Sequence, residues 1–490
     1  MNGRLATYRA TLQLYFQRLD WPLLIFLTLF LNVKLYIKVI AILLAMILRG
    51  RPVFSKGKLP AWWGFYAAML SLAVINLLLS FSSLSLSALY AFGLGCAYWL
   101  LAMLAAWQVY LFVQQGDRKK IHATTGVFFL LNAGIMILSY IRICIEAGVL
   151  NPYNYEGAHR KYFIGTGDRI TGIGLDSSVT AAMTGAFGVL YFLYRGRGDR
   201  ALLCFIAVLL ATSNTVNYLL LAVLAIALLL YSDRLQKSMI VIFFGLMIIF
   251  AAKVSPSNQQ YAHNLLGRLV GRNAYEEPVP IPHAAWTQFV ESKVVEQKET
   301  KLHTFMEDLY TPGEVDSIKR QYTGWNLSGR KIAWQSLGRF FQVHPARLLL
   351  GAGMGNFSSQ LAFRTTALGI EGNYPARHAY IHPFFRNNYL FIYLYYHTRD
   401  EGQHSMINKP DSVYGQVLSE YGLIGFSCFI VLYLAFFGWG IWRRRGRSYG
   451  IPLLLMMAGA FLTEYWFEQL SVVVLFELLM LMDKETCIQK

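Results

Sequence analysis

Charged side chains are scarce in this sequence of 490 residues. Asp, Glu, Lys and Arg together make up 14% of the chain, whereas hydrophobic residues make up 56%. A soluble domain carries about 25% charged residues, so most of this chain is not expected to face water. Apolar runs long enough to cross a bilayer recur along the sequence. The composition therefore predicts a multi-spanning membrane protein.

The sequence also lacks the residue patterns of metal and disulfide sites. Its five cysteines form no CxxC pair, and none lies in the long polar segment 255–414, so no disulfide framework is expected there. No HExxH or DxD motif occurs. His378 and His382 are spaced to bind a metal from one helical face, but no acidic ligand flanks them. We therefore expect no metal and no cofactor.

Acidic residues are the minority among the charges. The 44 Lys and Arg residues exceed the 27 Asp and Glu residues, which gives a formal net charge of +17. In a soluble protein such an excess would suggest a nucleic acid partner. No nucleic-acid-binding motif occurs here, and the excess of basic residues in cytoplasmic loops of membrane proteins accounts for the charge. We expect membrane lipids around the chain and no nucleic acid.

The apolar runs predict an all-α integral membrane protein with about twelve transmembrane helices. Two runs, 18–49 and 200–232, have basic residues on both sides, so each should cross twice. Lys34 and Lys38 then lie at the outer tip of the first hairpin, and Thr212–Thr215 form the turn of the second. No cleavable signal peptide is evident, and both termini are expected in the cytoplasm. The other runs are 61–80, 88–113, 121–147, 176–194, 238–254, 415–441, 450–466 and 468–482.

This topology divides the chain into three parts. Residues 1–254 are expected to form an N-terminal membrane bundle with an external loop at 148–175. Residues 255–414 form a large, mainly helical external segment between helices nine and ten, and residues 415–490 hold the last three helices and a short cytoplasmic tail. The external segment contains eight of the ten histidines, and polar side chains gathered on one face favour chemistry there. In a bacterium with an outer membrane, that face is the periplasmic side of the inner membrane.

Parts of the external segment have recognisable local patterns. Residues 329–343 are predicted to be a helix that starts after Ser328 and ends at His344-Pro345, with apolar residues at helical spacing. Three alternating glycines at 351–355 favour a turn, because they lack the GxGxxG spacing of a nucleotide site. The aromatic residues of 384–396 are expected either to anchor the segment at the bilayer interface or to gate a lateral opening for a lipid.

Two stretches resemble a known family. Ser328-Gly329-Arg330, with Trp334, Pro345 and the run LGAGMGNF at 350–357, is similar to the external-loop pattern of the O-antigen ligase and O-antigen polymerase superfamily. The run DSVYGQVLSEYGLIG at 411–425 resembles the stretch where that family's loop re-enters the membrane, HNxYLQxLxExGxxG. The predicted twelve-helix layout agrees. Two positions depart from the pattern: Asp411 replaces the usual histidine, and Asn214 replaces an arginine that often follows Ser213.

The resemblance implies transfer of a glycan from undecaprenyl diphosphate to an acceptor hydroxyl on the periplasmic face, without a metal. In a ligase the acceptor is lipid A–core, and in a polymerase it is another lipid-linked glycan. We favour the ligase and keep the polymerase as the alternative. From another class, a polysaccharide or lipid transporter or flippase fits the helix number, although no half-repeats are evident. A peptidoglycan glycosyltransferase and an inactive scaffold are further alternatives.

A lipid diphosphate needs permanent positive charge, and arginine binds phosphate oxygens in pairs. Arg330 is the first candidate because it matches the family motif, and Lys331 is placed beside it as a supporting residue. Three other arginines are candidates by their location alone: Arg377, Arg386 and Arg169.

The acceptor hydroxyl needs a base. Asp411 occupies the family position and would serve, unless it is only the N-cap of the next helix. His404 and His382 are reserve bases. Glu420 and Tyr414 are predicted to support the site. A carboxylate inside an apolar helix is costly unless it is paired, so Glu420 is expected to hold an arginine or to dock the external loop.

Overall fold

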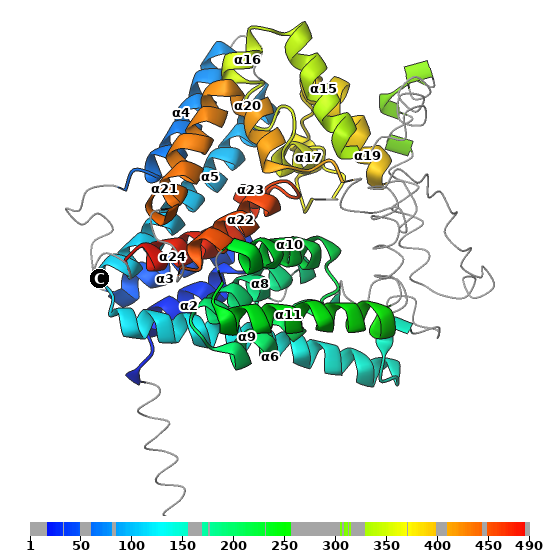
Figure 1. Ribbon diagram of the computed structural model, residues 1–490. Helices are drawn as coiled ribbons and strands as arrows, with labels where there is room; N and C mark the ends of the chain where they lie inside the picture. The colour runs from blue at the N-terminus through cyan, green and yellow to red at the C-terminus, as the bar shows by residue number, and fades with distance from the viewer. Residues whose placement is uncertain are drawn as a thin grey trace, which may run out of the picture.

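The computed structural model describes residues 17–32, 34–49, 60–80, 85–154, 169–174, 177–230, 232–255, 304–305, 308–311, 313–314, 329–369, 371–397, 409–442 and 448–485. Within these ranges every regular element is a helix and none is a strand (Figure 1). The predicted all-α architecture is confirmed.

The apolar runs of the sequence are occupied by helices. Before the external segment these are α2 Trp21–Phe30, α3 Leu35–Arg49, α4 Trp63–Leu79, α5 Leu86–Gln115, α6 Arg118–Ala147, α8 Ser178–Tyr194, α9 Gly198–Leu210, α10 Asn214–Leu230 and α11 Arg234–Ile249. After it come α20 Val413–Cys428, α21 Phe436–Trp442, α22 Gly450–Ala460, α23 Trp466–Gln469 and α24 Ser471–Glu485. Short π-helical turns at Phe250–Val254 and Phe429–Ala435 continue α11 and α20.

Four helices in the described residues are long and apolar enough to cross a membrane: Leu86–Gln115, Arg118–Ala147, Arg234–Val254 and Val413–Trp439. Six further apolar helices have 10–17 residues. These helices indicate a membrane protein. The number of twelve crossings, the position of the external segment and the side of each terminus stay predictions.

The two long apolar runs each break into two helices, as expected. The side chain of Asp20 accepts a hydrogen bond from the Leu23 nitrogen and starts α2, and α2 packs against α3. Between α9 and α10, Thr212 adopts a left-handed backbone conformation with φ of 44°. The polar residues there form the turn that the sequence indicated.

Lys38 does not lie at an exposed hairpin tip. Because α3 begins at Leu35, Lys38 lies within the first turn of the helix and only 2% of it is exposed. Its Nζ donates to the Phe30 carbonyl over 2.8 Å and to the Ser471 hydroxyl over 2.6 Å. The lysine therefore satisfies the carboxyl end of α2 and joins it to α24.

The last apolar runs do not form two simple helices. Helix α22 ends at Ala460, whose carbonyl accepts hydrogen bonds from Thr463 Oγ1 over 2.7 Å and from Trp466 Nε1 over 2.8 Å. One helical turn, α23, follows, and Leu470 has φ of 64° before α24 begins. The interruption, 461–465, contacts the start of α20, because the Val413 nitrogen donates to the Phe461 carbonyl.

The described part of the external segment has its own small core. The predicted helix at 329–343 is confirmed as α15 Gly329–Val343. The shorter helices that follow it are α16 Arg347–Leu350, α17 Gln360–Thr365, η6 Ala376–His378, α18 Pro383–Phe385, η7 Arg386–Leu390 and α19 Phe391–His397. In Figure 1, α15, α17 and α19 lie together beside the first turns of α20.

The aromatic residues of 384–396 serve this core more than a bilayer interface. Phe385, Tyr389 and Tyr393 are all buried, and they join a cluster that includes Phe340 of α15 and Phe363 of α17. The expected anchoring at the bilayer interface is therefore wrong for these three rings, whereas gating of a lateral opening stays a prediction. The reason is that α15 packs against η7 and α19, which turns the rings inward.

Candidate active site

The two stretches that carry the family resemblance contact each other. The glycine turn at 351–355 lies against α20, where the Ala352 nitrogen donates to the Ser419 carbonyl over 2.8 Å and the Gly353 nitrogen donates to the Glu420 carbonyl over 3.0 Å. These carbonyls are available because α20 leaves helical geometry at Gly422, with φ of 66° and ψ of −166°. The predicted turn is confirmed.

Glu420 docks this turn. It is fully buried, and its Oε2 accepts a hydrogen bond from the Gly355 nitrogen over 3.0 Å. Its Oε1 accepts a second, longer bond from the Phe357 nitrogen over 3.4 Å. Both oxygens of the Glu420 carboxylate thus accept backbone N–H groups of the external segment. These contacts match the loop-docking role that was considered for Glu420.

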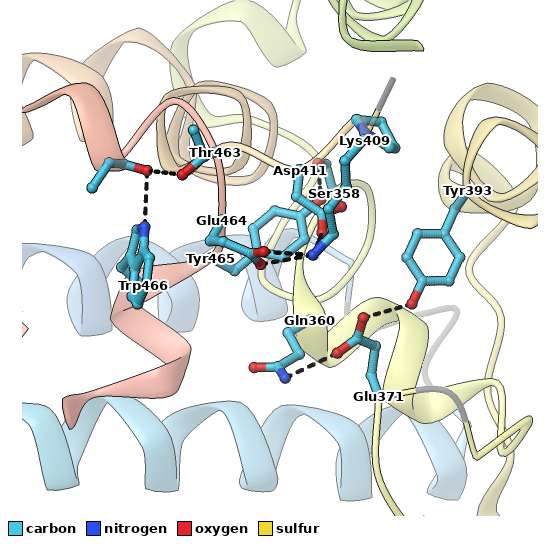
Figure 2. A network of polar contacts seen from close by, with 12 residues as sticks. Ser358, Gln360, Glu371, Tyr393, Lys409, Asp411, Thr463, Glu464, Tyr465 and Trp466 are labelled. Carbon is cyan, nitrogen blue, oxygen red and sulfur yellow. Dashed lines mark hydrogen bonds and ion pairs between the residues drawn. The ribbon is translucent and has the colours of Figure 1, made fainter. Parts of the chain in front are cut away.

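Asp411 belongs to an ion-pair cluster directly before α20, in which Lys409 is the central residue (Figure 2). Its Oδ2 is 3.0 Å from Lys409 Nζ, and the same nitrogen lies 2.7 and 2.8 Å from the two carboxylate oxygens of Glu464. Only 1% of Asp411 is exposed. Its Oδ1 is also buried and has no hydrogen-bond partner among the described residues, so one oxygen of this carboxyl lacks a hydrogen-bond donor.

Asp411 is not the N-cap of α20. That position belongs to Ser412, whose Oγ accepts a hydrogen bond from the Gly415 nitrogen. The capping alternative for Asp411 is therefore wrong, and its carboxyl does not cap the helix.

Burial raises the pKa of Asp411 to about 7, since a buried site disfavours the charged form. The neighbouring Lys409 opposes this shift, whereas the negative charges of Glu464 and Glu371 add to it. Burial also disfavours the charge of Lys409, but the surrounding carboxylates outweigh it and hold the pKa of its ammonium well above the usual value. The cluster thus combines a permanent cation with a carboxyl that titrates near neutral pH.

Glu371 is a third carboxylate near Asp411 and Glu464 (Figure 2). Its Oε1 accepts a hydrogen bond from the Tyr393 hydroxyl over 2.6 Å, and its Oε2 accepts one from Gln360 Nε2 over 3.1 Å. Arg364 Nε donates to its backbone carbonyl over 2.8 Å. The position of Glu371 is therefore fixed from α17 and α19 together.

Tyrosine hydroxyls link the cluster to the core of the external segment. Tyr389 donates to the Pro410 carbonyl over 2.7 Å and lies 3.2 Å from the Tyr465 hydroxyl. Burial raises the pKa of Tyr389; Asp411 acts in the same direction and the positive charge of Arg330 acts against it. Arg330 and Asp411 are thus both close enough to Tyr389 to influence one phenol electrostatically.

The other predicted arginines have different surroundings. The exposed Arg386 donates from Nη2 to the Leu309 carbonyl over 2.6 Å, and its guanidinium lies over the ring of Tyr310. Arg377 is exposed in η6, and Arg169 is exposed near the end of its loop. Of the four arginines, Arg330 is the one whose charge acts on Tyr389, the phenol on which Asp411 also acts, whereas the other three are exposed.

The remaining predicted site residues have separate positions in the fold. His382 caps α18, because its Nδ1 accepts a hydrogen bond from the Phe384 nitrogen over 3.1 Å, and burial lowers its pKa to about 4. Tyr414 donates to the Ala458 carbonyl over 2.9 Å and joins α20 to α22. Lys331 is exposed on α15. His404 lies outside the described residues.

The histidine pair does not share a helical face. His378 ends the short helix η6 and stacks on Tyr90 of α5 with ring centroids 4.6 Å apart, whereas His382 lies beyond that helix. Among the residues that the structure describes, no group of three or more His, Cys, Asp or Glu side chains is arranged to hold a metal ion.

Sequence reasoning missed Lys409, Glu464 and Glu371. A signal existed for Glu464, which is an acidic residue at the end of the apolar run 450–466, where an unpaired charge is costly. Lys409 precedes Asp411 by two residues, a spacing that places both at the same helix entrance. Glu371 lies in a polar stretch, and nothing in the sequence distinguishes it from a solvated carboxylate.

Comparison with known proteins does not assign the chain to a family. No family model, no curated protein and no solved structure matches the chain. The function is therefore argued from the cluster around Asp411 and from the two stretches that meet at Glu420.

Proposed function

We propose that this protein is a glycosyltransferase of the O-antigen ligase type. It would move a glycan from undecaprenyl diphosphate to a hydroxyl of lipid A–core on the periplasmic face of the inner membrane. The observation that carries the proposal is the Asp411 carboxyl, which is buried, has one oxygen without a hydrogen-bond partner among the described residues, and titrates near pH 7. A base with such a pKa is suited to general base catalysis at neutral pH.

In this mechanism the acceptor hydroxyl donates its hydrogen bond to Asp411 Oδ1. As the acceptor oxygen attacks the anomeric carbon of the donor sugar, its proton passes to Asp411. The bond between the anomeric carbon and the diphosphate oxygen breaks, and the lipid diphosphate leaves with the electron pair. Lys409, 3.0 Å from Oδ2, keeps the carboxylate oriented.

The leaving diphosphate gains negative charge, which a fixed cation stabilises. Arg330 is the first candidate, because its charge lowers the pKa of Tyr389, the phenol whose pKa Asp411 raises. Loss of one such preorganised group typically lowers turnover by a factor of about 10² to 10³. The predominance of carboxylates around Lys409 fits the acceptor side of the reaction better than the diphosphate side.

The decisive experiment is transfer by the purified full-length chain in nanodiscs, with undecaprenyl-diphosphate glycan as donor, lipid A–core as acceptor and a chelator present. We expect capped lipid A–core from the wild type and loss of product in Asp411→Asn. The matched control is Asp308→Asn, because Asp308 is exposed in the same external segment and should leave transfer unchanged.

Other products would change the assignment. Longer carrier-linked chains with uncapped core would identify a polymerase that uses the same donor. Folded protein that gives no product with either acceptor, from a verified donor, would contradict glycan transfer and favour a transporter or an inactive scaffold.

A further inference from the structure

We infer that Glu464 is a positioning residue that prevents Lys409 from pairing exclusively with Asp411. This inference rests on the proposed function, in which Asp411 is the base. It adds a residue from the interruption between α22 and α23, a part of the chain that neither family-like stretch includes.

The geometry of the lysine supports this role (Figure 2). A lysine ammonium has three hydrogen-bond donors. Its Nζ lies 2.7 and 2.8 Å from the two oxygens of Glu464 but 3.0 Å from a single oxygen of Asp411. Glu464 therefore accepts two of the lysine contacts, and the second oxygen of Asp411, Oδ1, stays outside the ion pair.

The fold fixes the two carboxylates independently. Asp411 is held at the entrance of α20, where Ser412 caps the helix and its Oγ also donates to the Phe461 carbonyl. Glu464 is held by the turn after α22, which Thr463 and Trp466 close on the Ala460 carbonyl. Because both backbones are constrained, the lysine side chain, of which 22% is exposed, is the adjustable partner.

The charged groups that act on Asp411, among the residues that the structure describes, fit this arrangement. Glu371 raises the pKa of Asp411 by its charge, but its carboxylate oxygens already accept hydrogen bonds from Tyr393 and Gln360. Tyr389 and Tyr465 are buried phenols whose hydroxyls are hydrogen-bonded to each other, and Asp411 raises the pKa of Tyr389. Glu464 is thus the described group that competes directly with Asp411 for Lys409.

Glu464→Gln tests the inference because it keeps the shape of the side chain and removes its charge. Lys409 should then pair more closely with Asp411, whose pKa falls because an adjacent cation stabilises its ionised form. We expect the acid limb of the kcat/KM profile for glycan transfer to move down by about 1 to 2 pH units. The plateau rate should fall as well, since the base becomes weaker.

Lys409→Met is the opposing variant. Without the cation, the charge of Asp411 is disfavoured further, so the acid limb should move to higher pH. Glu371→Gln is the matched carboxylate control: it removes one negative charge without touching the Lys409 pair, and we expect a smaller downward shift than in Glu464→Gln. An unchanged acid limb in Glu464→Gln, with a uniform loss of rate, would show that Glu464 is only structural.

A measurement without catalysis separates this inference from the proposed function. The thermal midpoint of each variant in detergent is compared between pH 4 and pH 8 with that of the same variant carrying Asp411→Asn. The difference reports the titration of Asp411 alone and should move to lower pH in Glu464→Gln. If this shift appears but no variant transfers glycan, the proposed function fails and the positioning role stands. If the titration does not move, the positioning role is overturned even when transfer is observed.

Discussion

The backbones of Gly351 and Gly422 are in direct contact. A Cβ atom placed on Gly422 would lie 2.6 Å from the Gly351 nitrogen and 2.4 Å from the Leu349 carbonyl. A Cβ atom on Gly351 would lie 2.4 Å from the Glu420 carbonyl carbon. Both residues have positive φ, 76° and 66° respectively. This contact joins the two family-like stretches and can form only where both positions lack a side chain.

Gly422→Ala should therefore disrupt the docking of the glycine turn. A residue other than glycine in this backbone conformation costs about 1 to 3 kcal/mol, and the clash with backbone atoms adds to that cost. We expect a clear drop in the thermal midpoint of the detergent-solubilised protein. The control is Gly134→Ala in α6, where a Cβ atom would meet nothing within 4 Å. Equal midpoints for the two variants would contradict the close contact.

Much of the helical architecture follows from the sequence alone. Apolar periodicity and basic flanks place the breaks within 18–49 and 200–232, because polar residues interrupt a run too long for one helix. The end of α22 at Ala460 could not be predicted in this way, since the residues that follow it are also largely apolar. It depends on the hydrogen bonds of Thr463 and Trp466 to one carbonyl, which a linear pattern does not reveal.

The candidate site was also predictable only in part, because a linear pattern reveals motif positions but not contacts between distant residues. Asp411, Arg330 and Glu420 were identified because they occupy motif positions. Asp411 and Glu420 are buried, and the charge of Arg330 acts on Tyr389. Glu464 approaches Lys409 only because α22 ends early and turns back toward the start of α20. Arg386 was a candidate by its location alone, and a linear pattern could not show that its guanidinium donates to the Leu309 carbonyl.

Glu420→Gln should weaken the docked turn without removing the side chain. Both carboxylate oxygens accept backbone N–H groups, and an amide would direct its own N–H donors at one of them. An unsatisfied buried group of this kind costs about 1 to 3 kcal/mol. The thermal midpoint should fall, whereas Glu146→Gln, at an exposed pair with Arg142, should change stability by less than about 0.5 kcal/mol. A midpoint unaffected by Glu420→Gln would exclude the docking role.

The titration of Asp411 predicts how stability depends on pH. Its pKa rises from the ordinary value of 3.8 to about 7 on folding, so between these values the folded state binds the proton more tightly. Stability must then fall as the pH rises from about 4 to about 7. Relative to Asp411→Asn, which cannot titrate, the wild-type midpoint should decline across this interval and level off above it. A constant difference between the two proteins would mean that the carboxyl is already ionised at pH 4.

Arg330 and Arg386 allow the assignment of the diphosphate ligand to be tested on one scaffold. Both are arginines of the external segment, but only Arg330 shares the neighbour Tyr389 with Asp411, whereas Arg386 is exposed and bound to Leu309. Arg330→Ala should lower the transfer rate by a factor of about 10² to 10³, as expected for loss of one group that stabilises developing charge. Arg386→Ala should keep most of the activity and lower only the thermal midpoint.

The pattern of kinetic loss makes this comparison specific. If Arg330 acts on the leaving group, kcat and kcat/KM for the lipid-linked donor should fall together, because the interaction strengthens in the transition state. A loss confined to KM would indicate simple donor binding. Equal losses in Arg330→Ala and Arg386→Ala would place the diphosphate away from Tyr389, and the acceptor base at Asp411 would then have to work opposite a cation from another part of the chain.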